Sequence, residues 1–131
     1  MYFYSSIVII AKGHKAIAKI KGRFKDMNKL IVSIGLLDKD SKTQLIDNEQ
    51  AMQKVNDCFL SRLDAFTVYF AKGVYTHDNG QQVQENTIRV EVVTFNDNDY
   101  NNTIKSIKEV KQALNQETIL LEKQVIDSYL I

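Results

Sequence analysis

The chain has no proline, only one cysteine and no apolar run long enough to cross a membrane. Without proline, its helices and strands must be interrupted by Gly, Asn and Asp. The single cysteine, Cys58, excludes an intrachain disulfide and a cysteine-based metal cluster, and it fits a cytoplasmic protein. The apolar run from Ile7 to Ala11 is far shorter than the roughly 20 residues that a bilayer span needs. No basic stretch precedes this run, so we expect no signal peptide.

The residues that are present are typical of one small globular domain. The 131 residues include 44% hydrophobic and 25% charged side chains, which argues against disorder. The net charge of +1 predicts no general attraction to nucleic acid or to an anionic membrane.

The charge is distributed unevenly along the chain. Residues 1–26 carry six Lys and Arg side chains and one acid, whereas residues 27–131 carry eleven basic and fifteen acidic side chains. The net charges are therefore +5 and −4. We interpret residues 1–28 as a basic N-terminal extension and residues 29–131 as the folded domain, for which we expect no nucleic-acid partner.

The extension has three possible interpretations. It can form an extra β-hairpin, in which residues 4–11 and 15–24 are joined at Gly13-His14. It can instead be a basic amphipathic arm that contacts phosphates or lipid head groups. Alternatively, translation begins at Met27, because codons for "KGRFKD" can resemble a ribosome-binding site just before that Met. Mass spectrometry of the native protein would test this last interpretation.

The rest of the chain predicts alternating strands and helices. The expected strands are rich in β-branched and aromatic residues and lie at 29–37, 65–75, 85–95 and 118–126. Apolar residues at spacings of three and four predict two helices between these strands. The first helix is capped by Asp47 or Asn48 and ends near Leu63, and the second is capped by Asn98 or Asp99.

This β-α-β-β-α-β order predicts an α+β, ferredoxin-like fold. In that fold a four-stranded antiparallel sheet carries two helices on one face, and here the extension or hairpin is added to it. The other face of the sheet stays open for a second subunit, an extra element or a ligand. The stretch "HDNGQ" between the two middle strands predicts a tight turn, because Asn79-Gly80 accepts positive φ at both central positions.

Several segments resemble known proteins. They are "SIGLLDKDSKTQLI", "AFTVYFAKGVYTHDNGQQVQENTIRVEVV" and "LNQETILLEKQVI". Residues 30–131 look like a group of small uncharacterised proteins of low-GC bacteria, their phages and mobile elements. They are also similar to a broader bacterial family of unknown function, with matching positions at Thr67, Gly73, Tyr75, Gly80 and Glu85. The resemblance implies a ferredoxin-like, often oligomeric fold and a phage setting, and it implies no catalytic residue.

The candidate binding residues are Tyr69, Tyr75, Arg89 and Glu91, which alternation along the two middle strands places on the open sheet face. The tyrosines and the arginine can stack on a base and bind an anion. The structural alternative is that the arginine pairs with a nearby glutamate and the tyrosines fill a subunit interface.

Other chemistry is weakly represented in the sequence. Asp38 and Asp40 lack the glycine and the final glutamate of an EF-hand loop, so we expect a solvated loop. His14 and His77 have no ligand-spaced partner, so we expect no metal site and no other cofactor. We expect Cys58 to be a small buried side chain and assign no catalytic residue.

These observations favour a non-enzymatic binding protein that forms a homo-oligomer. We expect it to be phage-encoded and to act against host defence by sequestering a small anionic, nucleotide-like ligand. One alternative is a protein-interaction inhibitor that docks on a host protein. Another is a small dimeric ferredoxin-like barrel enzyme, which would need a pocket-facing His or acid.

Overall fold

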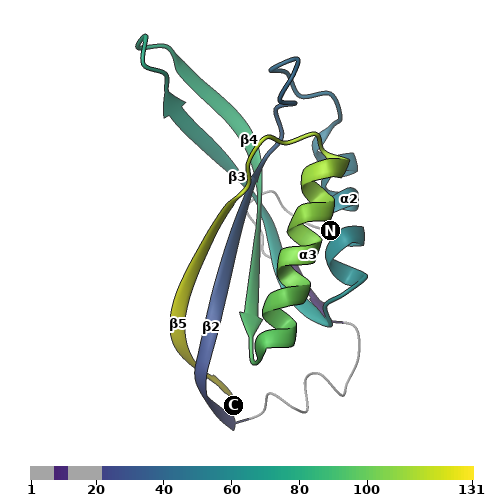
Figure 1. Ribbon diagram of the computed structural model, residues 1–131, viewed down its shortest axis with the longest axis vertical. Coiled ribbons are helices and arrows are strands. Elements are labelled where there is room, and N and C mark those ends of the chain that lie inside the picture. The colour runs from purple at the N-terminus through teal and green to yellow at the C-terminus, as the bar shows by residue number, and fades with distance from the viewer. Residues whose placement is uncertain (1–7, 12–21) are drawn as a thin grey trace.

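The computed structural model describes residues 8–11 and 22–131 (Figure 1). Its elements are β1 (Val8–Ala11), β2 (Gly22–Gly35), α2 (Asn48–Leu60), β3 (Ala65–Thr76), β4 (Gln82–Thr94), α3 (Asp97–Ala113) and β5 (Leu120–Leu130). From β2 onwards, the order is the predicted β-α-β-β-α-β.

Within the described residues, the strands form one five-stranded sheet in the order β1-β3-β4-β2-β5. Every neighbouring pair is antiparallel. The four strands β3, β4, β2 and β5 form the sheet of a ferredoxin-like fold, so the predicted α+β fold is confirmed. The short strand β1 adds a fifth strand beside β3.

The two faces of the sheet differ in what they contact. Both helices lie on one face, which we call the inner face (Figure 1). Val68 and Val32 both pair with Val90 on the inner face. Tyr69 and Ser33 both pair with Arg89 on the opposite side, which we call the outer face. The predicted alternation along the middle strands therefore agrees with the structure.

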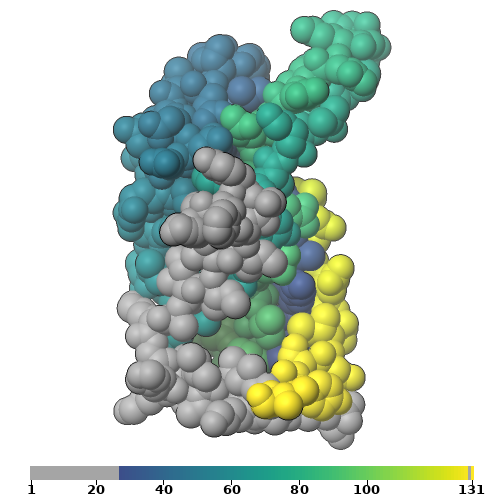
Figure 2. Space-filling view, turned by 180° about the vertical axis from the view of Figure 1, so that it is seen from behind, coloured from purple at the N-terminus to yellow at the C-terminus, as the bar shows by residue number. Residues whose placement is uncertain are grey.

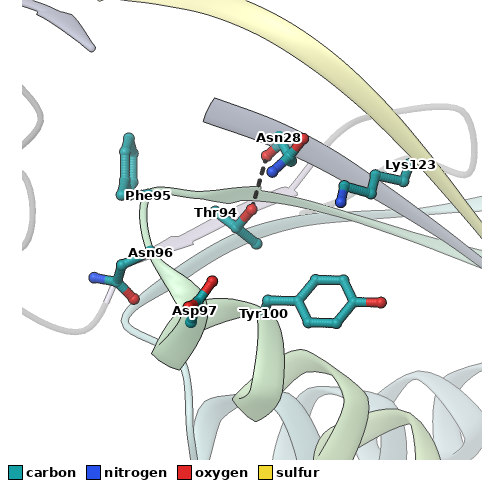
Figure 3. A pocket seen from close by; sticks show the side chains of 7 residues that line it. All are labelled: Asn28, Thr94, Phe95, Asn96, Asp97, Tyr100 and Lys123. Carbon is teal, nitrogen blue, oxygen red and sulfur yellow. Dashed lines mark hydrogen bonds between the residues drawn. The ribbon is translucent and has the colours of Figure 1, made fainter. Parts of the chain in front are cut away.

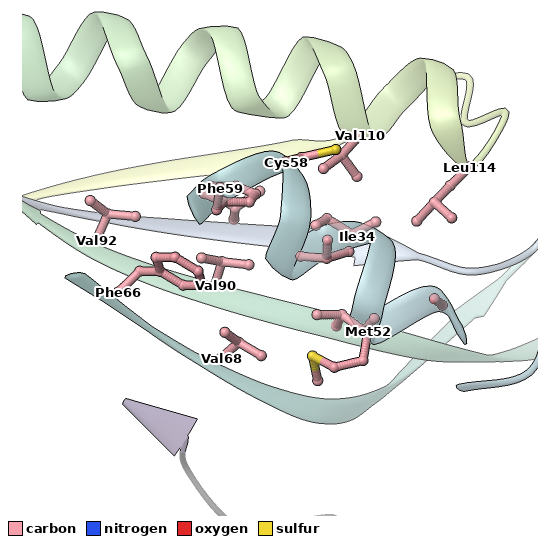
Figure 4. Packing of buried hydrophobic residues seen from close by; sticks show 14 of the residues in the cluster. Ile34, Met52, Cys58, Phe59, Phe66, Val68, Val90, Val92, Val110 and Leu114 are labelled. Carbon is pink, nitrogen blue, oxygen red and sulfur yellow. The ribbon is translucent and has the colours of Figure 1, made fainter. Parts of the chain in front are cut away.

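The hydrophobic core lies between the helices and the inner face (Figure 4). Phe59 of α2 packs against Phe66 of β3 with ring centroids 5.5 Å apart. The other large side chains with almost no exposure include Leu30, Ile34, Val55, Ile88 and Val110. This layer fixes the sheet rigidly, and so it also fixes the side chains on the outer face.

Local side-chain bonds set where the helices begin. Asp47 caps α2 as predicted, because its carboxylate accepts the amide N–H of Gln50 at 2.8 Å. The predicted caps of α3 are wrong, since Asn96 is the cap and accepts the N–H of Asp99 at 2.9 Å. The carboxylate of Asp99 reaches back to the N–H of Phe95 at 3.0 Å, which completes a reciprocal arrangement.

Two small polar side chains of α3 are fully buried, and one of them bonds to α2. Ser106 of α3 is fully buried and donates to the carbonyl oxygen of Cys58 at 3.1 Å. Thr103 is also fully buried and donates to the carbonyl of Asp99 at 2.8 Å. Each buried hydroxyl is therefore satisfied by a backbone carbonyl.

The β3–β4 hairpin extends beyond the sheet as a two-stranded arm. The carbonyl of Asn86 accepts the N–H of Leu36 at 3.0 Å, and from there to the tip of the hairpin β4 pairs only with β3 in the described residues. We call residues 72–86 the arm. Its base contacts the rest of the protein through Glu85 and Asn86, and Figure 2 shows its outer part standing clear of the molecule.

The predicted turn lies at the tip of the arm, where Gly80 donates its N–H to the carbonyl of His77 at 2.8 Å, but the predicted positive φ at both Asn79 and Gly80 is wrong. Only Gly80 has positive φ there, so this is a type I turn with a glycine bulge.

The predicted extension is only partly covered by the structure. β2 begins at Gly22 and crosses the expected boundary at residue 28 without a break. Its first residues pair with the end of β5, and the register shifts between Phe24 and Met27. The predicted hairpin over residues 4–24 falls mostly outside the described residues, as do the basic arm and His14.

Candidate functional site

Three of the four predicted binding residues meet on the outer face. The hydroxyl of Tyr69 donates to a carboxylate oxygen of Glu91 at 2.7 Å. The Nε of Arg89 donates to that same hydroxyl at 3.2 Å. All three side chains are partly buried. The tyrosine is thus the central member of a hydrogen-bond network that includes two charged side chains and links β3 to β4.

A fourth member, Lys29, was not predicted. Its ammonium lies 2.9 Å from the second carboxylate oxygen of Glu91. It comes from β2, where it pairs with Val93 and so lies diagonally across from Glu91. Once β2 and β4 are aligned, the alternation of Lys29 with Leu30 is the signal that places this lysine on the outer face. We call Lys29, Tyr69, Arg89 and Glu91 the outer-face cluster.

The cluster fixes the protonation of two of its members. Partial burial raises the pKa of Glu91, but the hydrogen bonds from Lys29 and Tyr69 outweigh burial and lower its pKa below the ordinary value. Partial burial and the bond to Glu91 raise the pKa of Tyr69. At neutral pH the cluster therefore holds a carboxylate, a neutral phenol and two cations.

The cluster retains capacity to bind a ligand. A guanidinium has five N–H donors, and only the Nε of Arg89 is engaged in the contacts found among the described residues. Ser33, which pairs with Arg89, has a buried hydroxyl with no hydrogen-bond partner in the described residues. A carboxylate-bearing ligand could use the remaining donors of Arg89, because a carboxylate accepts bidentate bonds from arginine.

A second carboxylate lies farther along the same face. Glu85 accepts the backbone N–H of Leu37 at 2.9 Å, and its side chain lies over Gly35. A Cβ at Gly35 would collide with this carboxylate, so the glycine leaves the space that the glutamate occupies. Glu85 and Arg89 are four residues apart on one strand, which is about 13 Å.

Tyr75, the fourth predicted binding residue, does not join the cluster. It lies on the arm, where it pairs with Val83 and is exposed. Its ring meets that of His77 edge-on with centroids 5.4 Å apart. The structure therefore separates this tyrosine from Tyr69 along β3.

A cavity of ≈ 440 Å³ lies elsewhere, where α3 begins (Figure 3). Its lining residues are Asn28, Thr94, Phe95, Asn96, Asp97, Tyr100 and Lys123. The hydroxyl of Thr94 is already bonded to the carbonyl of Asn28 at 3.2 Å, and the ammonium of Lys123 lies 5.6 Å from the ring centre of Tyr100. None of the predicted binding residues lines this cavity.

The remaining candidate groups have structural roles. Asp38 is buried rather than solvated, and its carboxylate accepts the N–H of Ser41 at 2.9 Å and the side-chain amide of Asn115 at 2.7 Å. The prediction of a solvated loop is therefore wrong for Asp38, because loop closure consumes its carboxylate. Cys58 is buried as predicted. In the part of the chain that the structure describes, no three His, Cys, Asp or Glu side chains could hold a metal.

The fold and the cluster define a ferredoxin-like domain with a charged outer face. No protein-family model and no curated protein sequence matches the chain. Among solved structures, a phage SAM lyase in complex with S-methyl-5′-thioadenosine matches with a TM-score of 0.59 and 19% identity, over 77% of this chain and 82% of that one. A phage SAM lyase in the apo state matches with a TM-score of 0.58 and 21% identity, over 75% and 79%. At these identities the likeness shows a common fold.

These matches correct the functional prediction. The expectation of a non-enzymatic, ligand-sequestering protein is wrong, because the matched structures are those of an enzyme. The alternative of a small ferredoxin-like enzyme fits better. Both matched structures are phage proteins, in line with the phage resemblance, whereas relatives in low-GC bacteria stay a prediction. Among the described residues, no helix is long and apolar enough to cross a membrane.

Proposed function

We propose that this protein is a lyase that cleaves S-adenosylmethionine (SAM) and releases S-methyl-5′-thioadenosine. The observation that carries the proposal is the outer-face cluster, which combines an ionised glutamate with an arginine whose other donors have no partner among the described residues. The fold that the chain shares with a phage SAM lyase supports the same reaction class.

The cluster matches the amino acid end of SAM. Arg89 and Glu91 are two residues apart on β4, which is about 7 Å. Arg89 would bind the substrate carboxylate and Glu91 its ammonium group, with the hydroxyl of Tyr69 between them. The nucleoside end would then extend along the outer face toward Glu85, whose carboxylate can accept the ribose hydroxyls.

The reaction balances with the substrate's own atoms. Cleavage between the sulfonium sulfur and the amino acid chain leaves both bonding electrons on sulfur, which becomes the neutral thioether of S-methyl-5′-thioadenosine. The released carbon chain completes its valence either by losing a proton from the neighbouring carbon to solvent water, which acts as the base, or by bonding to an oxygen of its own carboxylate, which closes a lactone. The protein's role in either route is to hold the two ends of SAM in the reactive geometry.

The direct test is to incubate the purified protein with SAM and to measure S-methyl-5′-thioadenosine by mass spectrometry. Glu91→Gln and Arg89→Ala should each lower the rate at least tenfold, because each removes one charge that holds the amino acid end. His77→Ala at the arm tip and Glu117→Gln after α3 are the matched controls and should keep the wild-type rate. Equal rates in all four variants would contradict the proposed site.

The location can be tested separately from the activity. Lys29→Gln changes the outer-face cluster, whereas Lys123→Gln makes the same change in the cavity at the start of α3. The proposed site predicts that only Lys29→Gln weakens SAM binding in calorimetry. A selective loss in Lys123→Gln would move the site to the cavity.

The biological setting is part of the proposal. SAM is a methyl donor, so a phage-encoded lyase would deprive host methylating enzymes, including those used in defence, in the cytoplasm. We also propose a homo-oligomer, because the arm exposes Val74 and Tyr75 and a two-stranded ribbon is barely stable alone. Light scattering of the purified protein should therefore give a mass above 15.0 kDa.

A further inference from the structure

We propose that the outer edge of β5 pairs with β5 of a second copy of the chain, antiparallel, about a twofold axis at Val125. The pairing would join two five-stranded sheets into one. It does not depend on the SAM reaction, since β5 contributes no member of the outer-face cluster.

The first observation is that β5 is a long edge strand. It has 11 residues and lies at the end of the sheet, where it pairs with β2. Within the described residues, no strand lies on its other side. In Figure 1 and Figure 2 it runs along one margin of the molecule. Such an edge is a template for another strand unless it is protected.

The second observation is the exposure of apolar side chains along this strand. Val125 is 79% exposed and Tyr129 is 56% exposed, although both are β-forming residues in a regular strand. Pairing about Val125 places the two copies of this valine directly opposite each other. It also places Tyr129 opposite Leu121 of the second copy, so the exposed apolar side chains gain apolar neighbours.

The third observation is that this register matches charges. Antiparallel pairing about Val125 puts Lys123 opposite Asp127 of the second copy, and the symmetry repeats this pair. A shift of two residues in one direction puts Lys123 opposite Val125, and a shift in the other puts it opposite Tyr129. Only the proposed register therefore joins the two opposite charges, and opposite charges directly across a strand pair are stabilising. Asp127 also interacts within its own chain, but a carboxylate can accept several bonds.

The faces of the two sheets agree in this arrangement. Along β5, inner-face side chains alternate with outer-face ones: Leu121, Lys123 and Val125 lie on the inner face, and Leu120, Glu122 and Gln124 lie on the outer face. Pairing about Val125 therefore places the inner face of one sheet beside the inner face of the other. Glu122 faces Ser128 on the outer side, and no like charges are opposed. The two copies can therefore pair without placing a charge against its own kind.

The experiment is a charge swap followed by sedimentation analysis of the full-length protein. The wild-type protein should be a dimer, or a larger assembly that contains this dimer. Lys123→Asp and Asp127→Lys should each weaken dimerisation about tenfold, because two symmetric pairs become repulsive. The double variant K123D/D127K should recover the wild-type constant. The swap does not restore the contact of Asp127 within its own chain. Recovery of the wild-type dimerisation constant would therefore show that the single variants act through the contact between copies.

Val125→Lys is the second test, because it puts two lysines face to face on the axis. It should yield a smaller assembly with unchanged circular dichroism, since the native valine is largely exposed. The proposal is overturned by a wild-type monomer at high concentration. It is equally overturned if the single variants or Val125→Lys leave the assembly unchanged, or if the double variant does not recover.

Discussion

The hydroxyl of Tyr69 lies between Arg89 and Glu91, accepting a bond from the guanidinium and donating one to the carboxylate at 2.7 Å. The tyrosine is on β3 and its two partners are on β4, so the contact spans a strand pair that the hydrophobic core holds in register. This relationship makes the outer-face cluster one unit, because a change in any member alters the bonds of the others.

The first prediction concerns the phenolic hydroxyl itself. Tyr69→Phe keeps the ring but leaves the Nε of Arg89 and one oxygen of Glu91 without their partner. We expect a loss of about 1 kcal/mol in the free energy of unfolding, measured by urea denaturation. Tyr129→Phe, at an exposed position on β5, should change it by only a few tenths of that value. Equal effects of the two variants would show that the Tyr69 bonds contribute nothing.

The second prediction follows from the lowered pKa of Glu91. Because its pKa is lower in the folded than in the unfolded protein, ionised Glu91 stabilises the fold above its ordinary pKa. That stabilisation is lost as the pH falls through the folded-state pKa. The difference in stability between the wild type and Glu91→Gln should therefore be largest at neutral pH and should shrink as the pH falls through the folded-state pKa of Glu91. A difference that stays constant as the pH falls would contradict the ionised pair with Lys29.

The third prediction concerns the glycine beneath Glu85. In Gly35→Ala the new Cβ would displace the carboxylate of Glu85, which would lose its bond to the N–H of Leu37. We expect a loss of about 1 kcal/mol in stability and weaker binding of the nucleoside end of SAM. Gly80→Ala is the control, because it strains the arm tip but meets no neighbouring atom. Unchanged binding in Gly35→Ala would remove Glu85 from the proposed site.

The fourth prediction concerns Cys58. Burial, with a smaller contribution from nearby Glu109, raises the pKa of its thiol to about 11. Few thiolates are then present at neutral pH, and the thiolate is the reactive form. A disulfide reagent such as Ellman's reagent should react much more slowly with the native protein than with the urea-unfolded chain. Comparable rates would contradict the burial of Cys58 between the helices.

The sequence predicted the fold well, because strand alternation and helical stripes are strong local signals. It missed the beginning of β2, where the register shift between Phe24 and Met27 interrupts the alternation. It also misplaced the cap of α3, because Asn96, Asn98 and Asp99 are all good capping residues. In the structure, the local hydrogen bond from the N–H of Phe95 to Asp99 accompanies the cap at Asn96.

The candidate site was only partly predictable. Face alternation was enough to group Tyr69, Arg89 and Glu91, but it also included Tyr75, because parity does not say how far a strand extends beyond its sheet. Lys29 was missed because its place depends on the register between β2 and β4. The proposed reaction predicts no sequence motif, because the sulfonium of SAM already provides a good leaving group and needs no activated nucleophile on the protein.

The central claim is that the protein turns over SAM. The most direct measurement is the amount of S-methyl-5′-thioadenosine formed per protein molecule, with SAM in large excess and heat-denatured protein as the blank. We predict many product molecules per protein molecule, and at least tenfold slower product formation by the Glu91→Gln variant. Binding of SAM without product, or product that stops at one molecule per protein molecule, would contradict the proposed lyase.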